Sequence, residues 1–259
     1  MLKTRLEELK QYAFVIKQLN LKEHKRKTDE TNLGVVWNVL NPLLYMVVLS
    51  TYYQNVIKHD IENFPVFVFS GITIYCFYSN GTKSAMHSFV GNKNFLVKAK
   101  IPSEVYILQK VLYAFKEMMF SMVALVPILC FFHIRITWRA IQLLPILLLT
   151  TATIIGLGEV LAVVYVFFSD IDYLYSVFMT MMVFISGVFI PIDHLPKTMQ
   201  GILSYNPIFL SIYIFRNALF YNLPSYWTAW VKMIFWATSQ VIIGYIMLKR
   251  NKNRLMRKL

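Results

Sequence analysis

Long apolar runs with few charges recur along the chain, and they constrain its fold more than any other feature. A helix needs about 20 residues to cross the roughly 30 Å hydrocarbon core of a bilayer. Charged residues make up only 15% of the chain, whereas about 25% is usual in soluble domains. The runs lie at about 35–57, 64–86, 105–132, 141–168, 173–190 and 227–248. We therefore predict an all-α integral membrane protein with six transmembrane helices.

The segment before the first run, residues 1–34, is polar and basic. Its apolar residues recur every three or four positions, which places them on one face of a helix. That face consists of Leu2, Leu6, Leu9, Ala13 and Ile16. A basic amphipathic helix of this kind typically lies in the membrane interface. The alternative is a short soluble helix packed on a partner, and one helix can do both.

Prolines interrupt the chain between the fifth and the sixth run, at Pro191, Pro196, Pro207 and Pro224. The apolar segments between them, 199–203 and 208–220, are too short to cross a bilayer. Segments of this length are typical of re-entrant or interfacial elements. We therefore predict short re-entrant helices here, with a loop folded over the outer surface as the alternative.

The basic residues indicate how the chain is oriented. The net charge is +13, and in so apolar a chain it indicates basic segments beside membrane spans rather than nucleic-acid binding. Seventeen lysines and arginines fall on the side of the two termini and five on the other side. The positive-inside rule then places both termini in the cytoplasm. This organisation divides the chain into an interface segment (1–34), a membrane domain (35–248) and a basic cytoplasmic tail (249–259).

Motifs that carry catalysis are missing from the sequence. There is no GxxxxGK[ST] loop, so the chain is not expected to hold ATP phosphates in a P-loop by itself. The five histidines are scattered, and the two cysteines, Cys76 and Cys130, lie in separate apolar runs. We therefore predict no catalytic residue, no metal site and no cofactor in this chain.

Charged residues inside the apolar runs are expensive in a bilayer, so they usually face the protein interior and find partners. Lys110 and Lys116 lie in the third run and Glu159 in the fourth. Counted at about 1.5 Å per residue from the cytoplasmic ends of the two runs, the three side chains lie at depths in the membrane that allow them to meet. We predict that Glu159 pairs with Lys110 or Lys116 and joins the two spans. A proton or ion relay is the alternative.

The loop between the second and third runs contains a candidate docking element. Residues 91–102 favour one short helix with an apolar patch surrounded by lysines. The residues singled out are Asn92, Lys93, Asn94, Phe95, Leu96 and Lys98. One interpretation is a basic loop on anionic lipid. The other is a plug that inserts into a groove of a cytoplasmic partner, and the sequence does not separate the two.

The order of these elements resembles the membrane subunit of ABC-2 type exporters, most closely the branch that exports O-antigen, teichoic acid and related surface polysaccharides. The resemblance rests on NLGVVWNVLNPL (32–43), SFVGNKNFLVK (88–98), FSDIDY (168–173), SGVFIP (186–191) and YNP (205–207) before Arg216. It covers essentially the whole chain. The chain departs from it at Ser169, where the family often has Arg.

This resemblance implies a bacterial export channel in the cytoplasmic membrane, built from two copies of the chain. Each copy would sit on a separate subunit that binds ATP and Mg²⁺. The loop around residues 92–98 would be the coupling helix that docks on this ATPase, and residues 2–19 the interface helix. The substrate would be a polyprenyl-diphosphate-linked glycan, moved from the inner to the outer leaflet. An ABC-2 exporter of small hydrophobic molecules and a membrane enzyme of envelope synthesis are the alternatives.

Aromatic residues in the first two runs suit such a substrate, because sugar rings stack on aromatic faces. The candidates for a substrate path are Tyr45, Tyr52, Tyr53, Phe69, Tyr75 and Tyr78. The alternative is that these aromatics serve as packing and as interfacial anchors.

Overall fold

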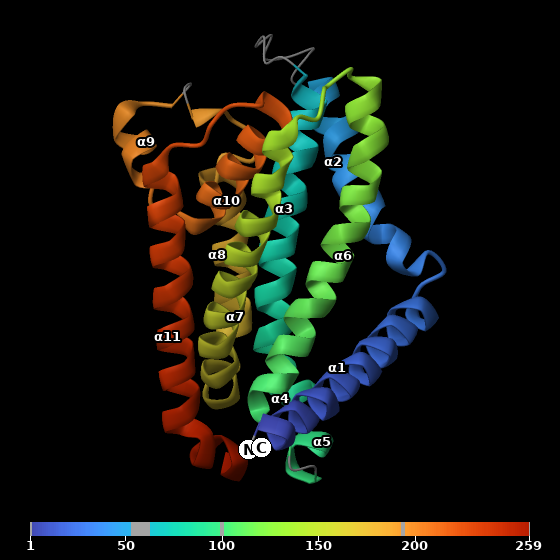
Figure 1. Ribbon diagram of the computed structural model, residues 1–259, viewed down its shortest axis with the longest axis vertical. Helices are drawn as coiled ribbons and strands as arrows, with labels where there is room; N and C mark the ends of the chain where they lie inside the picture. The colour runs from blue at the N-terminus through green and yellow to red at the C-terminus, as the bar shows by residue number, and fades with distance from the viewer. Residues whose placement is uncertain (1, 53–62, 99–100, 193–194, 259) are drawn as a thin grey trace.

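The computed structural model describes residues 2–52, 63–98, 101–192 and 195–258, with the side chains of 2–11, 35, 94, 97 and 98 left out. Within these ranges all regular structure is helical, and the longer helices run side by side in a bundle (Figure 1). The predicted all-α class is confirmed for this part of the chain.

Three described segments are long and apolar enough to span a membrane: α6 (Ser103–Phe131), η3 (Trp138–Gln142) together with α7 (Leu143–Phe167), and α11 (Trp227–Lys258). The bundle also contains α2 (Trp37–Tyr52), α3 (Phe64–Met86) and the shorter apolar helix α8 (Ile171–Ile185). α3 has the length of a span but carries Asn80 and Lys83 in its second half. Six crossings therefore stay a prediction.

The N-terminal helix α1 (Leu2–Glu30) is longer than predicted and lies obliquely at one end of the bundle (Figure 1). The short 3₁₀ turn η1 (Gly34–Val36) leads from it into α2. On the predicted apolar face, Ala13 is exposed and Ile16 is half-buried. Leu2, Leu6 and Leu9 lie in α1, with side chains outside the described part. The basic tail continues α11, whose last turn lies at the same end of the bundle as the start of α1.

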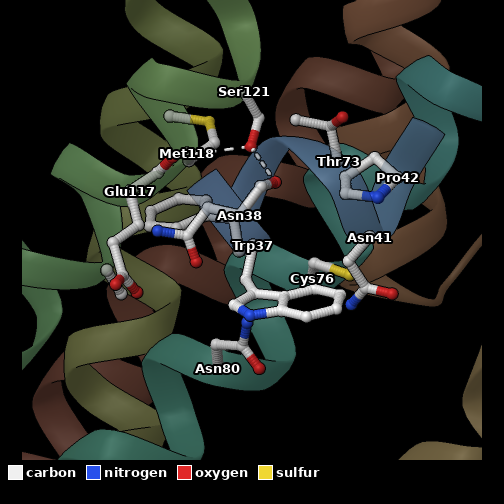
Figure 2. A pocket seen from close by; sticks show the side chains of 12 residues that line it. Trp37, Asn38, Asn41, Pro42, Thr73, Cys76, Asn80, Glu117, Met118 and Ser121 are labelled. Atoms are coloured by element: carbon white, nitrogen blue, oxygen red, sulfur yellow. Dashed lines mark hydrogen bonds between the residues drawn. The ribbon is translucent and has the colours of Figure 1, made fainter. Parts of the chain in front are cut away.

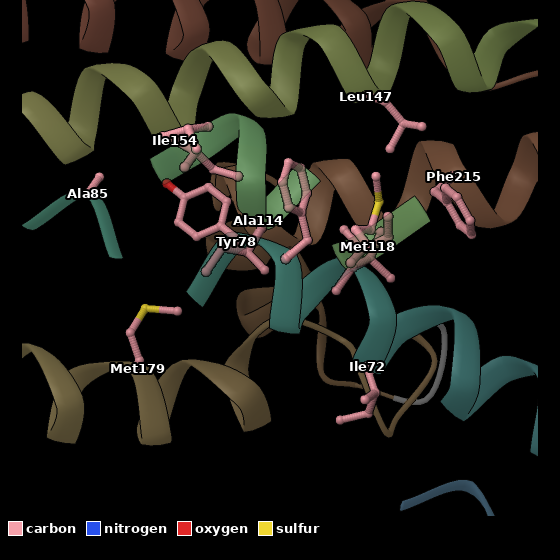
Figure 3. Close-up of a cluster of buried hydrophobic side chains, with 14 of the residues drawn as sticks. Ile72, Tyr78, Ala85, Ala114, Met118, Leu147, Ile154, Met179 and Phe215 are labelled. Carbon is pink, nitrogen blue, oxygen red and sulfur yellow. The ribbon is translucent and has the colours of Figure 1, made fainter. Parts of the chain in front are cut away.

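The core lies around α3, which contacts α2, α6, α7 and α10. Its buried side chains include Ile72 and Tyr78, and they belong to one apolar cluster with Met118 from α6, Ile154 from α7 and Phe215 from α10 (Pro207–Arg216) (Figure 3). Burial of such side chains on one central helix explains why α3 keeps its place despite its polar second half.

Small residues allow α7 and α11 to pack closely. A Cβ on Gly244 of α11 would lie 2.5 Å from the carbonyl oxygen of Gly156 on α7. Close approach of helix backbones at small residues is a usual means of packing in membranes, where apolar side chains gain little by meeting one another.

Short helices occupy the proline-rich region, as predicted. α9 (Lys197–Leu203) is followed by α10 (Pro207–Arg216), which continues as a π-helical turn, Asn217–Tyr221. Asn206 caps α10, since its side-chain oxygen accepts from the backbone N–H of Ile208 at 2.9 Å. α10 is buried against α3, α7 and α11. α10 is therefore not a loop on the outside, whereas most of α9 is exposed, and the re-entrant character of the two helices stays a prediction.

Candidate functional site

Within the candidate coupling segment, residues 91–102, the described part forms one short helix, α5 (Lys93–Lys98), as predicted, and a further short helix, α4 (Ser88–Gly91), precedes it. Asn92 lies between them, and its side-chain amide donates to the carbonyl oxygen of Ser88 at 2.9 Å. Leu96 is only 3% exposed and belongs to the core, so it holds α5 against the bundle.

On the outward side of α5, two of the residues predicted to dock are exposed in the part that the structure describes. Phe95 is 48% exposed, and the ammonium of Lys22 from α1 lies 4.9 Å from the centre of its ring. Lys93 is exposed as well. The side chains of Asn94 and Lys98 lie outside the described part. Among the predicted docking residues, Phe95 and Lys93 thus remain available to a partner, while Asn92 and Leu96 are buried.

Three polar contacts join α1 to α6, and their residues on α1 follow one another at intervals of about one helical turn. The amide of Gln109 donates to the Asn20 side chain at 3.0 Å, Lys110 binds Glu23 at 2.8 Å, and Lys27 binds Glu117 at 2.6 Å; these three contacts bring Asn20, Glu23, Lys27, Gln109, Lys110 and Glu117 together. Burial alone would raise the pKa of the Glu23 carboxyl, but hydrogen bonds from Lys110 and Arg26 outweigh it and hold that pKa below its ordinary value. These contacts hold α1 against α6.

The predicted pairing of Glu159 with Lys110 or Lys116 is wrong. Lys110 binds Glu23 on α1, and Lys116 is exposed, with its ammonium 5.8 Å from the centre of the Phe120 ring. Glu159 is buried, and its Oε2 has no hydrogen-bond partner among the described residues. Depth along a helix does not decide which neighbouring helix a side chain faces.

A cavity of about 170 Å³ lies between α2, α3 and α6. Pro42 of α2 lines this cavity. Because proline has no backbone N–H, the carbonyl of Asn38, one turn earlier, lacks its partner within the helix. Ser121 of α6 donates to that carbonyl at 2.7 Å (Figure 2). The proline therefore interrupts α2 while a neighbouring hydroxyl satisfies the freed backbone group, as is usual for proline in membrane helices.

The lining of this cavity is polar for a bundle of apolar helices. The indole of Trp37 lies across it, with Asn38, Asn41 and Asn80 around the ring (Figure 2). The other lining residues are Pro42, Thr73, Cys76, Phe77, Ala114, Glu117, Met118 and Ser121. Sequence reasoning missed this site, although two asparagines and a proline within the first apolar run were the signal.

Of the six aromatic residues predicted to line a path, the five that the structure describes do not meet in one place. Tyr45 and Tyr52 are exposed on α2, whereas Phe69 and Tyr78 are buried in the core. Tyr75 is half-buried, and its hydroxyl donates to the backbone carbonyl of Met179. Tyr53 lies outside the described residues. Phe69 and Tyr78 therefore serve packing within one copy of the chain.

Arg216 anchors α10 to its surroundings. The side chain is 5% exposed, and its guanidinium donates to the carbonyls of Gly187, Val188 and Phe67 at 2.6–2.8 Å and to the Ser70 hydroxyl at 3.3 Å. It also stacks on the Phe67 ring at 3.4 Å. This one side chain therefore joins α10, α3 and the segment after α8.

Residues 15–220, most of the helical bundle, match the family described as ABC-2 type transporter. The chain belongs to this ABC-2 type transporter family. An O-antigen export system permease protein of Myxococcus xanthus is 25% identical over 217 residues, 83% of each chain. One of Klebsiella pneumoniae is 22% identical over 202 residues, 78% of each chain. A polysialic acid transport protein of Escherichia coli is 21% identical over 251 residues, 92% of this chain and 93% of its own.

Membership in the ABC-2 family agrees with the helical structure of the described residues and with their long apolar helices. The chain is a helical ABC-2 permease, and the names of its bacterial relatives describe O-antigen export and polysialic acid transport. The short helices α4 and α5 lie at one end of the permease, together with the start of α1, and the anchored helix α10 lies toward the other end (Figure 1).

Proposed function

We propose that this chain is the transmembrane subunit of an ATP-driven exporter that moves a polyprenyl-diphosphate-linked surface polysaccharide across the bacterial cytoplasmic membrane. Two copies would form the channel, each crossing six times with both termini in the cytoplasm. The single observation that carries the proposal is the match to polysaccharide export permeases over about four fifths or more of both chains. Teichoic-acid-like polymers and O-antigen both fit this substrate class.

A separate ATP-binding subunit with Mg²⁺ would supply the energy. The sequence lacks a P-loop of its own. The exposed ring of Phe95 on α5, next to Lys22 of α1, offers a compact apolar and basic surface for such a partner. Because α5 is held to the bundle by Leu96, and α1 is held to α6, a displacement of this surface would pass into the membrane helices.

Two exposed phenylalanines provide the test. Phe95→Ala should lower co-purification of the permease with its ATPase and lower polymer export in cells that depend on this permease. Phe131, 78% exposed at the far end of α6, is the matched control, and Phe131→Ala should leave co-purification unchanged. Normal export after deletion of the permease would refute the transport role. Normal export with Phe95→Ala would refute the assignment of the docking surface only.

The topology can be tested separately by fusing reporters to both termini. Cytoplasmic activity of both fusions is expected. Activity of either fusion on the outer side of the membrane would contradict the orientation.

A further inference from the structure

The cavity between α2, α3 and α6 presents more hydrogen-bonding groups than its own packing uses. The Nδ2 of Asn38 is buried and has no acceptor among the described residues. The hydroxyl of Thr73, by contrast, donates a hydrogen bond to the backbone carbonyl of Phe69 at 2.8 Å. A buried donor without a partner is costly, and an acceptor from a water or a ligand is its usual explanation.

The remaining amides extend this polar lining toward the opening. Asn41 of α2 and Asn80 of α3 are exposed and line the same cavity. Each amide offers two donors and one acceptor. Together with Asn38 they present donors and acceptors to one small volume from two different helices. Polar side chains within apolar membrane helices cost free energy, and they typically mark a functional path.

Trp37 adds a flat apolar surface beside these amides. Its indole is 46% exposed and borders the cavity, with Asn80 beside the pyrrole end of the ring (Figure 2). An aromatic face surrounded by amides is the arrangement that suits a sugar, because the ring C–H groups pack on the indole while the hydroxyls exchange hydrogen bonds.

The charge of the cavity is compatible with such a ligand. Glu117 is the one carboxylate in the lining, and its Oε1 binds Lys27 of α1 at 2.6 Å. The pair neutralises the local charge, so neither a neutral nor an acidic sugar is repelled. The volume of about 170 Å³ is enough to hold a single sugar ring.

We infer that this cavity binds one pyranose unit of the exported glycan, with Trp37 as the stacking surface and Asn38, Asn41 and Asn80 as partners of its hydroxyls. The inference rests on the proposed function, from which it takes the class of ligand. It adds a recognition site within one copy of the chain, formed where Pro42 interrupts α2.

The two native cysteines provide a direct test. Cys76 lines the cavity, whereas Cys130 is exposed near the end of α6 and lies outside it. Cys130→Ser leaves Cys76 as the sole thiol, and Cys76→Ser leaves Cys130 as a matched control. Each variant is expressed with its full export complex, and its modification by a small methanethiosulfonate is followed in membranes.

Three kinds of cells separate the possible occupants: cells that make the lipid-linked glycan, cells that make only the polyprenyl phosphate, and cells with neither. We expect modification of Cys76 to be slowed at least threefold only where the glycan is made, and modification of Cys130 to be equal in all three. Equal modification of Cys76 in all cells would overturn the inference. Protection by the polyprenyl phosphate alone would also overturn it, because the occupant would then be lipid.

Variants of Trp37 link occupancy to transport. Trp37→Leu is expected to abolish the protection of Cys76 and to slow export about 2- to 10-fold, the range for loss of one aromatic stacking contact. Trp37→Phe, which keeps a ring, should retain most of both. Unchanged export and protection in Trp37→Leu would refute the site while leaving the exporter role intact. Unimpaired export in cells without the permease would instead refute the proposed function.

Discussion

Replacement of Arg216 by leucine tests whether one buried guanidinium holds α10 in place. The leucine cannot donate hydrogen bonds, so the carbonyls of Gly187 and Val188 lose their side-chain partner. The carbonyl of Phe67 keeps the hydroxyl of Ser70, which donates to it at 3.0 Å. Each buried polar group left without a partner costs about 1–3 kcal/mol. The two orphaned carbonyls therefore predict a loss of about 2–6 kcal/mol.

Gly71 makes the test specific. A Cβ at Gly71 would collide with Nη2 of Arg216, so Gly71→Ala should displace the guanidinium and destabilise the protein by itself. In the Arg216→Leu background, the same alanine should cost less, because the carbonyl oxygen of Val188, 3.1 Å from the added Cβ, is then the remaining close contact. The two substitutions are thus expected to be strongly non-additive, as contacting residues usually are.

Thermal unfolding of the purified permease in detergent measures both effects. At about 2–4 °C per kcal/mol for a chain of this size, Arg216→Leu should lower Tm by roughly 4–24 °C. Arg135→Leu, a change at an exposed arginine, should lie within about 0.5 kcal/mol of the native protein. Additive losses from Gly71→Ala and Arg216→Leu would refute the reasoning, as would an unchanged Tm in the single Arg216 variant.

Three further substitutions test the packing of the bundle by the same assay. Ser121→Ala leaves the carbonyl freed by the proline of α2 unpaired and should cost about 1–3 kcal/mol, whereas Ser121→Thr, which keeps a hydroxyl, should not. Lys110→Met removes a charged hydrogen bond from Glu23 and should cost about 1.5–3 kcal/mol at neutral pH. The pKa of Glu23 is lowered in the folded state. The stabilisation that the ionised Glu23 gives the folded state is therefore fully present above the unfolded pKa of about 4.3, and it is lost as pH falls through the folded-state pKa. The Lys110→Met variant should lose less stability on acidification, and an identical acid profile would count against the contact. Gly244→Ala should separate α11 from α7 at a cost of about 1–3 kcal/mol, while Gly201→Ala, with open space around it, is the control; equal Tm values for these two variants would contradict the close packing.

Much of the architecture was predictable from sequence because it depends on local composition. Apolar runs predict helices that need an apolar environment, and the prolines predict where the chain breaks into the short helices α9 and α10. The buried position of α10 was not predictable in the same way. It depends on Arg216 reaching the carbonyls of Gly187 and Val188, almost 30 residues away in the chain.

The polar contacts within the bundle were the part that sequence reasoning missed. Lys110 lies 87 residues after Glu23, and only the oblique path of α1 brings the two together. The same holds for the cavity, which needs a proline on α2, a serine on α6 and an amide on α3 at one depth. Periodicity reports which face of a helix is apolar, but it does not report which helix that face meets.

Reconstitution tests the central claim most directly. Purified permease and its ATP-binding partner are placed in liposomes that contain the lipid-linked glycan, and the appearance of glycan on the leaflet opposite the ATPase is followed. The account predicts transfer only when both proteins and Mg-ATP are present, and no ATP hydrolysis by the permease alone. Hydrolysis of ATP or chemical conversion of the glycan by the isolated chain would contradict it.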